Sequence, residues 1–175
     1  MAKSMPAQQP GKSKQDVRTP VVFLTAVKWR LGIDAFVVDL AASRANTVAK
    51  QFYSERSNAL VQSWVFDGWG FLNPPFGDLR PWVQKAYEEA RKGARTAMLV
   101  PAGVGSNWWR DFVHEKARVL LLNGRITFVG HKQPYPKDCA LLLFARYKAG
   151  DLYNRDLTPG YDVWTWAREQ KKATA

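Results

Sequence analysis

The 175 residues carry a net charge of +11, with 46% hydrophobic and 23% charged residues, a balance typical of one folded domain with a sizeable core. No apolar run reaches the roughly 20 residues that a membrane-spanning helix needs, and the polar N-terminus lacks the apolar centre of a signal peptide. A single cysteine, Cys139, allows no internal disulfide and fits a reduced, cytoplasmic setting. The basic excess favours a polyanionic partner, although a basic surface without a partner is the alternative.

The N-terminal segment, residues 1–17, is polar and aperiodic, and we predict a disordered basic arm there. A single domain is expected over 18–170, with a short tail at 171–175. Thr19-Pro20 has the form of a helix start, with threonine as the N-cap and proline at the first helical position. Apolar residues at helical spacing follow, and Gly32 can end this helix.

A short apolar run at 36–40 is typical of a buried parallel strand, and it contains one carboxylate, Asp39. Ligands of open α/β sheets bind beyond the carboxyl ends of the strands, where small residues such as Ala41 and Ala42 permit close approach. Asp39 is therefore expected to accept hydrogen bonds from a cationic ligand. A cap on the strand end is the alternative role for this side chain.

The rest of the chain alternates between short apolar runs and amphipathic stretches. Further strands are predicted at 69–72, 95–100, 118–122, 125–129 and 140–145, the third and fourth forming a hairpin through Asn123-Gly124. Further helices are predicted at 44–51, 79–92 with Asp78 as cap, 107–116 with Ser106 as cap, and 163–170. This order predicts a compact α/β domain whose sheet is mostly parallel, with an antiparallel strand pair near its C-terminal edge.

The strand at 69–72 leads into Asn73-Pro74-Pro75-Phe76. Each proline fixes its own φ and pushes its predecessor out of the helical region, so the chain leaves the strand stiffly. The Asn73 amide oxygen, the Pro74 carbonyl and the Phe76 ring can then face one small space. Two acceptors and a flat apolar surface suit an amino group on an aromatic ring, such as the exocyclic amine of adenine. An ordinary proline turn after a strand is the alternative.

Asn-Pro-Pro-Phe is one form of the Asp/Asn-Pro-Pro-Tyr/Phe motif of amino-group methyltransferases that use S-adenosylmethionine. The chain resembles the phage-type DNA N6-adenine methyltransferase family over about residues 18–146. Matching stretches occur in the family's order at 18–20, 38–43, 71–76, 98–101, 106–109, 124–128 and 134–144. The strand at 36–40 departs from the wider superfamily because no glycine-rich turn follows it, whereas the phage family itself has Asp-x-Ala-Ala here.

The resemblance implies a Rossmann-like class I methyltransferase fold with little or no separate target-recognition domain. It implies S-adenosyl-L-methionine as cofactor and double-stranded DNA as partner. The residues themselves offer no His, Cys and Asp cluster that suggests a metal, and a monomer is favoured. It also implies a phage or prophage origin, with methylation protecting DNA from restriction in a bacterial host.

The same resemblance assigns roles to individual positions of this chain. The implied catalytic residues are Asn73, Pro74, Pro75 and Phe76. The implied cofactor-binding residues are Thr19, Pro20, Asp39, Ala41, Ala42 and Asn73. The implied substrate-binding residues are Phe76, Trp108, Arg125, Phe128, Lys132 and Lys137. Core packing is the alternative for the aromatic residues at 108 and 128, and a solvated basic loop is the alternative for 130–138.

In the implied reaction, acceptors at Asn73 and Pro74 draw the two hydrogens of the adenine amine, so that its lone pair points at the methyl group. An amide is a poor proton acceptor, so no general base is assigned. The target base has to leave the duplex stack, at a cost of a few kcal/mol. The residues leave two alternatives open: a non-catalytic basic DNA-binding protein on the same fold, and a methyltransferase that acts on RNA or on protein glutamine.

Overall fold

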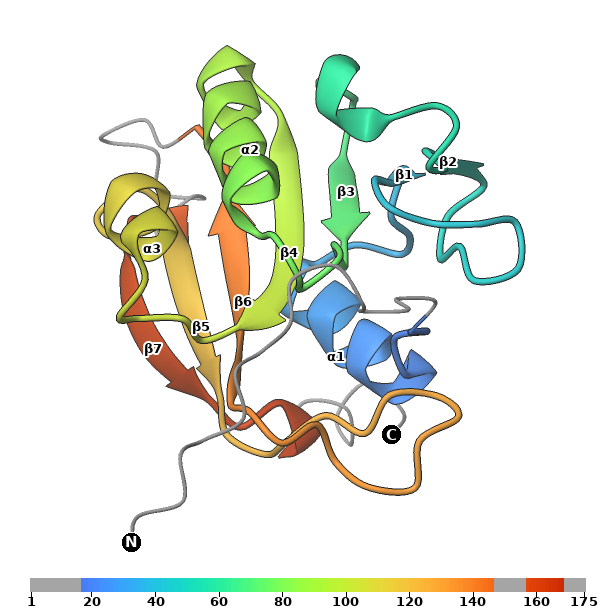
Figure 1. Ribbon diagram of the computed structural model, residues 1–175, viewed down its shortest axis with the longest axis vertical. Coiled ribbons are helices and arrows are strands. Elements are labelled where there is room, and N and C mark those ends of the chain that lie inside the picture. The colour runs from blue at the N-terminus through green and yellow to red at the C-terminus, as the bar shows by residue number, and fades with distance from the viewer. Residues whose placement is uncertain (1–16, 147–156, 169–175) are drawn as a thin grey trace, which may run out of the picture.

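The computed structural model describes residues 17–146 and 157–168, which form a sheet of seven strands with helices on both faces (Figure 1). The strand order is β2-β1-β3-β4-β6-β5-β7. The strands are β1 Val38–Asp39, β2 Gln51–Phe52, β3 Trp69–Leu72, β4 Arg95–Pro101, β5 Arg118–Leu122, β6 Cys139–Phe144 and β7 Gly160–Trp164. The helices are α1 Val21–Leu31, α2 Arg80–Lys92 and α3 Asn107–Phe112, with a 3-10 turn, η1, at Ala59–Val61.

All strand neighbours run parallel except β6, which is antiparallel to both β4 and β5. This confirms the predicted α/β class and the mostly parallel sheet with an antiparallel pair. All six residues of β6 are buried, because this strand lies inside the sheet with side chains packed on both faces. No helix of the described ranges combines the length and apolar character that crossing a membrane requires.

Side chains of β4 alternate between two cores on opposite faces of the sheet. Met98 and Val100 pack in the core that α2 and α3 cover, and Figure 1 shows these two helices in front of the sheet. Ala97 and Leu99 pack in the core that α1 covers on the other face. The strict period of two along a buried strand thus sends consecutive residues to different helices.

Helix α1 begins one residue later than predicted. Pro20 is the N-cap with ψ of 137°, and Thr19 lies outside the helix. The helix ends at Gly32, whose φ of 64° is the left-handed conformation that glycine adopts without steric cost. Helix α2 has Leu79 as its N-cap residue and no side-chain cap, so the predicted cap by Asp78 is wrong.

The helix predicted at 44–51 is absent, and the segment forms turns before β2. Local polar side chains explain the difference, because they offer the backbone partners other than a helical ladder. Asn46 Oδ1 accepts the Ser43 N–H at 2.6 Å, and Asp39 Oδ2 accepts the Val48 N–H at 3.0 Å. The segment therefore wraps around these acceptors.

The hairpin predicted between 118–122 and 125–129 is also wrong, since the antiparallel partner of β5 is β6. Residues 125–129 form an irregular segment whose apolar alternation buries Ile126 and Phe128. Its backbone bonds elsewhere, with the Val129 N–H donating to the Arg18 carbonyl. The predicted helix at 163–170 is wrong at its start, because Val163 belongs to β7; only 166–168 are helical, and 169–170 lie outside the described residues.

Helix α3 ends at Phe112 rather than at residue 116 as predicted. Most of the predicted N-terminal arm and the predicted tail at 171–175 lie outside the described residues.

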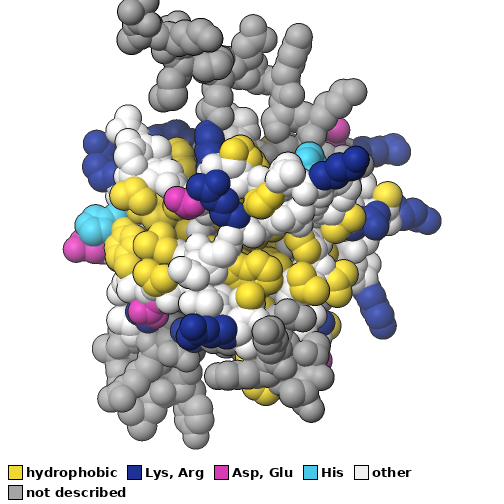
Figure 2. Space-filling view, turned by 90° about the horizontal axis from the view of Figure 1, so that it is seen from below, with side chains coloured by type: hydrophobic (Ala, Val, Ile, Leu, Met, Phe, Trp, Pro, Cys, Tyr) yellow, Lys and Arg dark blue, Asp and Glu magenta, His cyan; other side chains and the backbone are white. Residues whose placement is uncertain are grey.

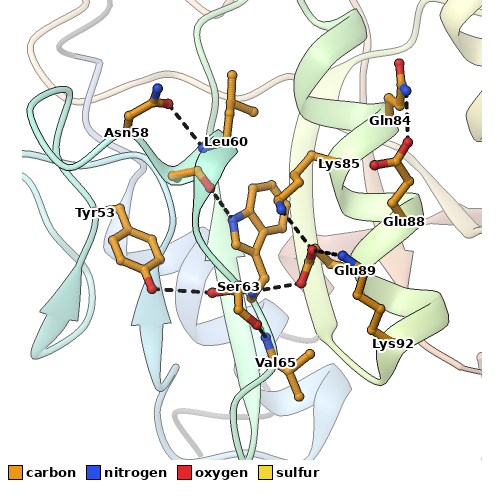
Figure 3. A network of polar contacts seen from close by, with 12 residues as sticks. Tyr53, Asn58, Leu60, Ser63, Val65, Gln84, Lys85, Glu88, Glu89 and Lys92 are labelled. Carbon is orange, nitrogen blue, oxygen red and sulfur yellow. Dashed lines mark hydrogen bonds and ion pairs between the residues drawn. The ribbon is translucent and has the colours of Figure 1, made fainter.

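A buried carboxylate fastens the loop before β3 to the end of α2 (Figure 3). Glu89 is 1% exposed and accepts the backbone N–H of Trp64 at 3.0 Å, and Lys85 and Lys92 each pair with it at 2.8 Å. Burial alone would raise the pKa of Glu89, but these three donors outweigh burial and lower the pKa to about 2. This network fixes the amino end of β3, at the other end of the strand from Asn73.

Candidate active site

Asn73 is the first residue after β3, whose four residues are all buried between β1 and β4. Its side-chain Nδ2 donates to the Val17 carbonyl at 3.1 Å and to Thr19 Oγ1 at 3.2 Å. Both acceptors lie in the segment that leads into α1, more than fifty residues earlier in the chain. The structure thus joins Thr19 and Asn73, which the sequence placed in one site without showing their contact.

Phe76, after the buried Pro74 and the exposed Pro75, lies among aromatic rings. Its ring centroid is 5.5 Å from that of Tyr135 and 6.2 Å from that of Phe128, and the latter two are 5.9 Å apart. We call these three residues the aromatic cluster. All three pairs meet edge to face, the arrangement that aromatic quadrupoles favour. The cluster joins the proline motif to the loop at 130–138.

Within the aromatic cluster, the two ring partners of Phe76 differ in how deeply they are buried. Phe128 is 4% exposed and belongs to the core under α1, which favours the core alternative for this residue. Tyr135 is half-buried, and it is not among the site residues predicted from the sequence. Its position between two prolines in a basic loop is a signal that could have marked it, because the flanking prolines restrict the backbone that carries the ring.

Asp39 is buried, and both of its carboxylate oxygens accept backbone N–H groups, from Ala41 at 3.3 Å and from Val48 at 3.0 Å. Burial raises the pKa of Asp39, and the two hydrogen bonds partly oppose that effect. This arrangement supports the strand-end cap that the sequence left as an alternative. Asp39 thereby fixes the course of the loop over 41–48.

A cavity of about 370 Å³ lies between one side of α1 with the two residues 18–19 before it, residues 35–36 and the segment 45–48. Thr19 lines the cavity and also accepts the hydrogen bond from Asn73, so the cavity adjoins the amide of the motif. Arg18 and Lys28 supply positive charge, and the Arg18 guanidinium donates to the Ala45 carbonyl. Of the predicted cofactor residues, Thr19 lines this cavity, whereas Pro20, Asp39, Ala41, Ala42 and Asn73 do not.

Of the remaining predicted substrate residues, Trp108 lies in the first turn of α3, and Arg125, Lys132 and Lys137 lie on the segment between β5 and β6. Trp108 is half-buried with its ring against Gly103, where an added Cβ would come within 2.6 Å of Cζ2, so only glycine fits. Arg125 forms an exposed ion pair with Asp138 at 3.4 Å. Lys132 and Lys137 lie between these two residues in the sequence, and both are exposed.

Figure 2 shows the molecule from below, the side on which α1 and the carboxyl end of β3 lie in Figure 1. Apolar side chains occupy the middle of this face, and Lys and Arg side chains surround them with few acidic ones. In the described part of the chain, no group of three or more His, Cys, Asp and Glu side chains could hold a metal ion.

The family model described as DNA N-6-adenine-methyltransferase (Dam) matches residues 7–151. The chain belongs to this family. A methyltransferase family and fold imply a methyl donor. The residues that the family model matches include Thr19, Asp39, the proline motif and Tyr135.

Two relatives are named DNA N-6-adenine-methyltransferase. The protein of Escherichia phage T1 is 28% identical over 109 residues, which cover 62% of this chain and 45% of the relative. The protein of Haemophilus phage HP1 (strain HP1c1) is 27% identical over 99 residues, which cover 55% of this chain and 57% of the relative. The chain therefore spans about half the length of the curated relatives that it matches.

Among solved structures, the chain is similar to the crystal structure of a putative RNA methyltransferase, PH1948 from Pyrococcus horikoshii. The TM-score is 0.50 at 14% sequence identity, over 83% of this chain and 94% of that chain. At this identity the likeness concerns the fold alone, and it agrees with the predicted Rossmann-like methyltransferase fold.

Proposed function

We propose that this protein transfers a methyl group from S-adenosyl-L-methionine to the exocyclic N6 amine of adenine in DNA. The observation that carries the proposal is the Asn73 amide at the end of β3, with its nitrogen directed at Val17 and Thr19 in a chain of the Dam family. The amide oxygen is then the end that can meet a substrate amine. Pro74 follows with a carbonyl, a second acceptor.

The bound cofactor supplies an activated methyl group on its sulfonium sulfur. The protein's task is to orient the amine, whose lone pair is delocalised into the purine ring. Asn73 Oδ1 and the Pro74 carbonyl would accept the two amine hydrogens, which favours a pyramidal nitrogen with its lone pair directed away from them. Neither acceptor can take up a full proton, so no side chain is assigned as general base, and the proton that the nitrogen loses on methylation would pass to solvent.

The cavity beside Thr19 is the proposed place of the cofactor. Its volume of about 370 Å³ lies within the range of small-molecule sites, about 300–1,000 Å³. Leu24 and Phe36 offer apolar contact, and Arg18 and Lys28 complement a carboxylate such as that of the cofactor's methionine part. Asp39 contributes indirectly, since it fixes the cavity wall at Val48.

The face in Figure 2 is the proposed DNA surface. Its basic rim fits phosphates, and its apolar centre fits a base that has left the stack. In the aromatic cluster, Phe76 and Tyr135 offer ring edges and faces to that base, in place of the buried Phe128. Lys132 and Lys137 would contact phosphates, and the protein would act as a monomer.

The deciding experiment is transfer of tritiated methyl from S-adenosylmethionine to unmethylated duplex DNA, followed by nucleoside analysis, with Asn73→Ala as control. Label in N6-methyladenine from the wild type alone is the expected result. Cofactor binding without label in DNA would favour RNA or protein glutamine as substrate. Salt-sensitive DNA binding without cofactor binding would favour the non-catalytic alternative.

The kinship with phage proteins supports one biological role for the reaction. We infer that adenine methylation protects DNA from restriction. DNA methylated by the protein should resist those adenine-sensitive endonucleases whose sites overlap the methylated sequence, and equal cleavage of treated and untreated DNA at every such site would contradict the role.

A further inference from the structure

The orientation of the Asn73 amide is fixed by its surroundings. The Val17 carbonyl can only accept a hydrogen bond, so the amide nitrogen, and not its oxygen, must face it. Thr19 Oγ1 lies 3.2 Å from the same nitrogen. Two acceptors therefore match the two hydrogens of one NH₂ group.

The acceptors themselves are held firmly. Thr19 is 3% exposed, and a hydroxyl in such a place requires hydrogen-bond partners. The residue between the acceptors, Arg18, accepts the Val129 N–H through its carbonyl at 3.0 Å and donates to the Ala45 carbonyl through its side chain. The segment is thus anchored on two sides before α1 begins.

We propose that Thr19 is a positioning residue for the methyl transfer, acting through Asn73. Its hydroxyl, together with the Val17 carbonyl, keeps Asn73 Oδ1 directed at the target amine. A reversed amide would set an NH₂ group against the hydrogens of the adenine amine, and the amine would have no acceptor there. This inference rests on the proposed function, and it assigns Thr19 a role besides lining the cofactor cavity.

The two roles predict different kinetics. Loss of a cofactor contact weakens cofactor binding and leaves turnover at saturating cofactor intact. Loss of amide orientation lowers turnover at saturating cofactor and DNA, because a misplaced group costs most in the transition state. A substitution that removes the Thr19 hydroxyl without changing the shape of the side chain therefore distinguishes the two roles.

The test compares Thr19→Val, which keeps the shape of the side chain, with Thr19→Ser, which keeps the hydroxyl. Thr25→Val, half-buried in the middle of α1, is the matched control. We expect Thr19→Val to lower kcat about tenfold or more while the Kd for S-adenosylmethionine stays within about threefold, and Thr19→Ser to restore most of kcat. Unchanged kcat in Thr19→Val, or a changed Kd as the sole effect, would overturn the inference.

A second measurement does not depend on activity. The side-chain NH₂ protons of Asn73, identified in a ¹H–¹⁵N spectrum by their absence in Asn73→Ala, should exchange with solvent faster in Thr19→Val than in wild type and Thr19→Ser. Equal exchange in all three proteins would contradict the positioning role. A wild type that binds cofactor but methylates no DNA would instead overturn the proposed function.

Discussion

Glu89 of α2 and the backbone of Trp64 are joined by a hydrogen bond that fastens the loop before β3 to the helix after it (Figure 3). The carboxylate is ionised, because the hydrogen bonds from Lys85, Lys92 and the Trp64 N–H overcome burial and hold its pKa at about 2. The acceptor charge is thus part of the folded structure. Neutralising Glu89 should therefore lower the stability of the protein and leave the candidate active site unchanged.

The first prediction concerns this carboxylate. Its folded pKa of about 2 lies below the ordinary value of 4.5, so its stabilising contribution is complete above pH 4.5 and is lost as the pH falls from 4.5 to 2. Glu89→Gln should therefore lower the free energy of unfolding at pH 7 by about 2 kcal/mol, and by less at pH 3. Urea unfolding at both pH values measures this. Glu88→Gln, an exposed neighbour on α2, is the control and should change little.

Replacing Asn73 should abolish the proposed reaction without unfolding the protein. Asn73→Ala removes the acceptor for the amine and leaves the Val17 carbonyl and Thr19 hydroxyl without the amide. We expect kcat to fall by about a hundredfold or more, with cofactor affinity within a few-fold. Single-turnover methylation and calorimetry test the two parts. Wild-type turnover in this variant would remove the residue from the chemistry.

Replacing Asp39 should weaken the cofactor through the loop that it holds. Asp39→Ala releases the N–H groups of Ala41 and Val48, and loss of hydrogen bonds to a charged group costs enough to reduce affinity about tenfold. Calorimetric titration with S-adenosylmethionine measures the change. Asp34→Ala, exposed and before β1, serves as the control. An unchanged dissociation constant would leave Asp39 with a capping role only.

Tyr135 should matter through its ring. Tyr135→Ala removes the ring 5.5 Å from Phe76, and we expect kcat/KM for DNA to fall about tenfold, the cost of one base–aromatic contact. Tyr135→Phe keeps the ring and should retain most of the activity. If the phenylalanine variant were as impaired as the alanine variant, the hydroxyl and not the ring would carry the effect.

The basic loop should set the salt dependence of DNA binding. Lys132→Ala and Lys137→Ala should each remove one lysine–phosphate ion pair, and each should reduce the slope of log K against log salt concentration by about 1. Fluorescence anisotropy at several salt concentrations provides the slopes. Lys116→Ala, just before β5 and so at the other end of that strand from the loop at 130–138, should leave the slope unchanged. Equal slopes in all variants would place the phosphates elsewhere.

Local sequence signals were sufficient for most elements near the site. β3, β4 and β5 are short apolar runs bounded by turn residues or prolines, and α2 ends at residue 92 as predicted, with Gly93 as its C-cap. The proline motif follows its strand as predicted, because prolines restrict the backbone whatever surrounds them. The α/β class followed from the alternation of these elements.

Long-range contacts explain what the sequence could not show. β5 pairs with β6 because β6 buries its side chains on both faces of the sheet. The alternation at 125–129 reflects the two buried side chains of Ile126 and Phe128 in a segment that is not a strand. The turns at 43–48 depend on Asp39, which lies before them in the chain. Tyr135 and the link from Thr19 to Asn73 join segments more than fifty residues apart, and no spacing encodes them.

The place of β6 between β4 and β5 has a consequence for synthesis of the chain on the ribosome. Until residues 139–144 emerge, the apolar strand β4 presents a free edge, and β5 lacks its antiparallel partner. An unpaired apolar edge is a template for aggregation. Incomplete chains that end before β6 are therefore expected to self-associate. Once β6 has been synthesised and pairs with β4 and β5, this edge is covered and no longer promotes aggregation.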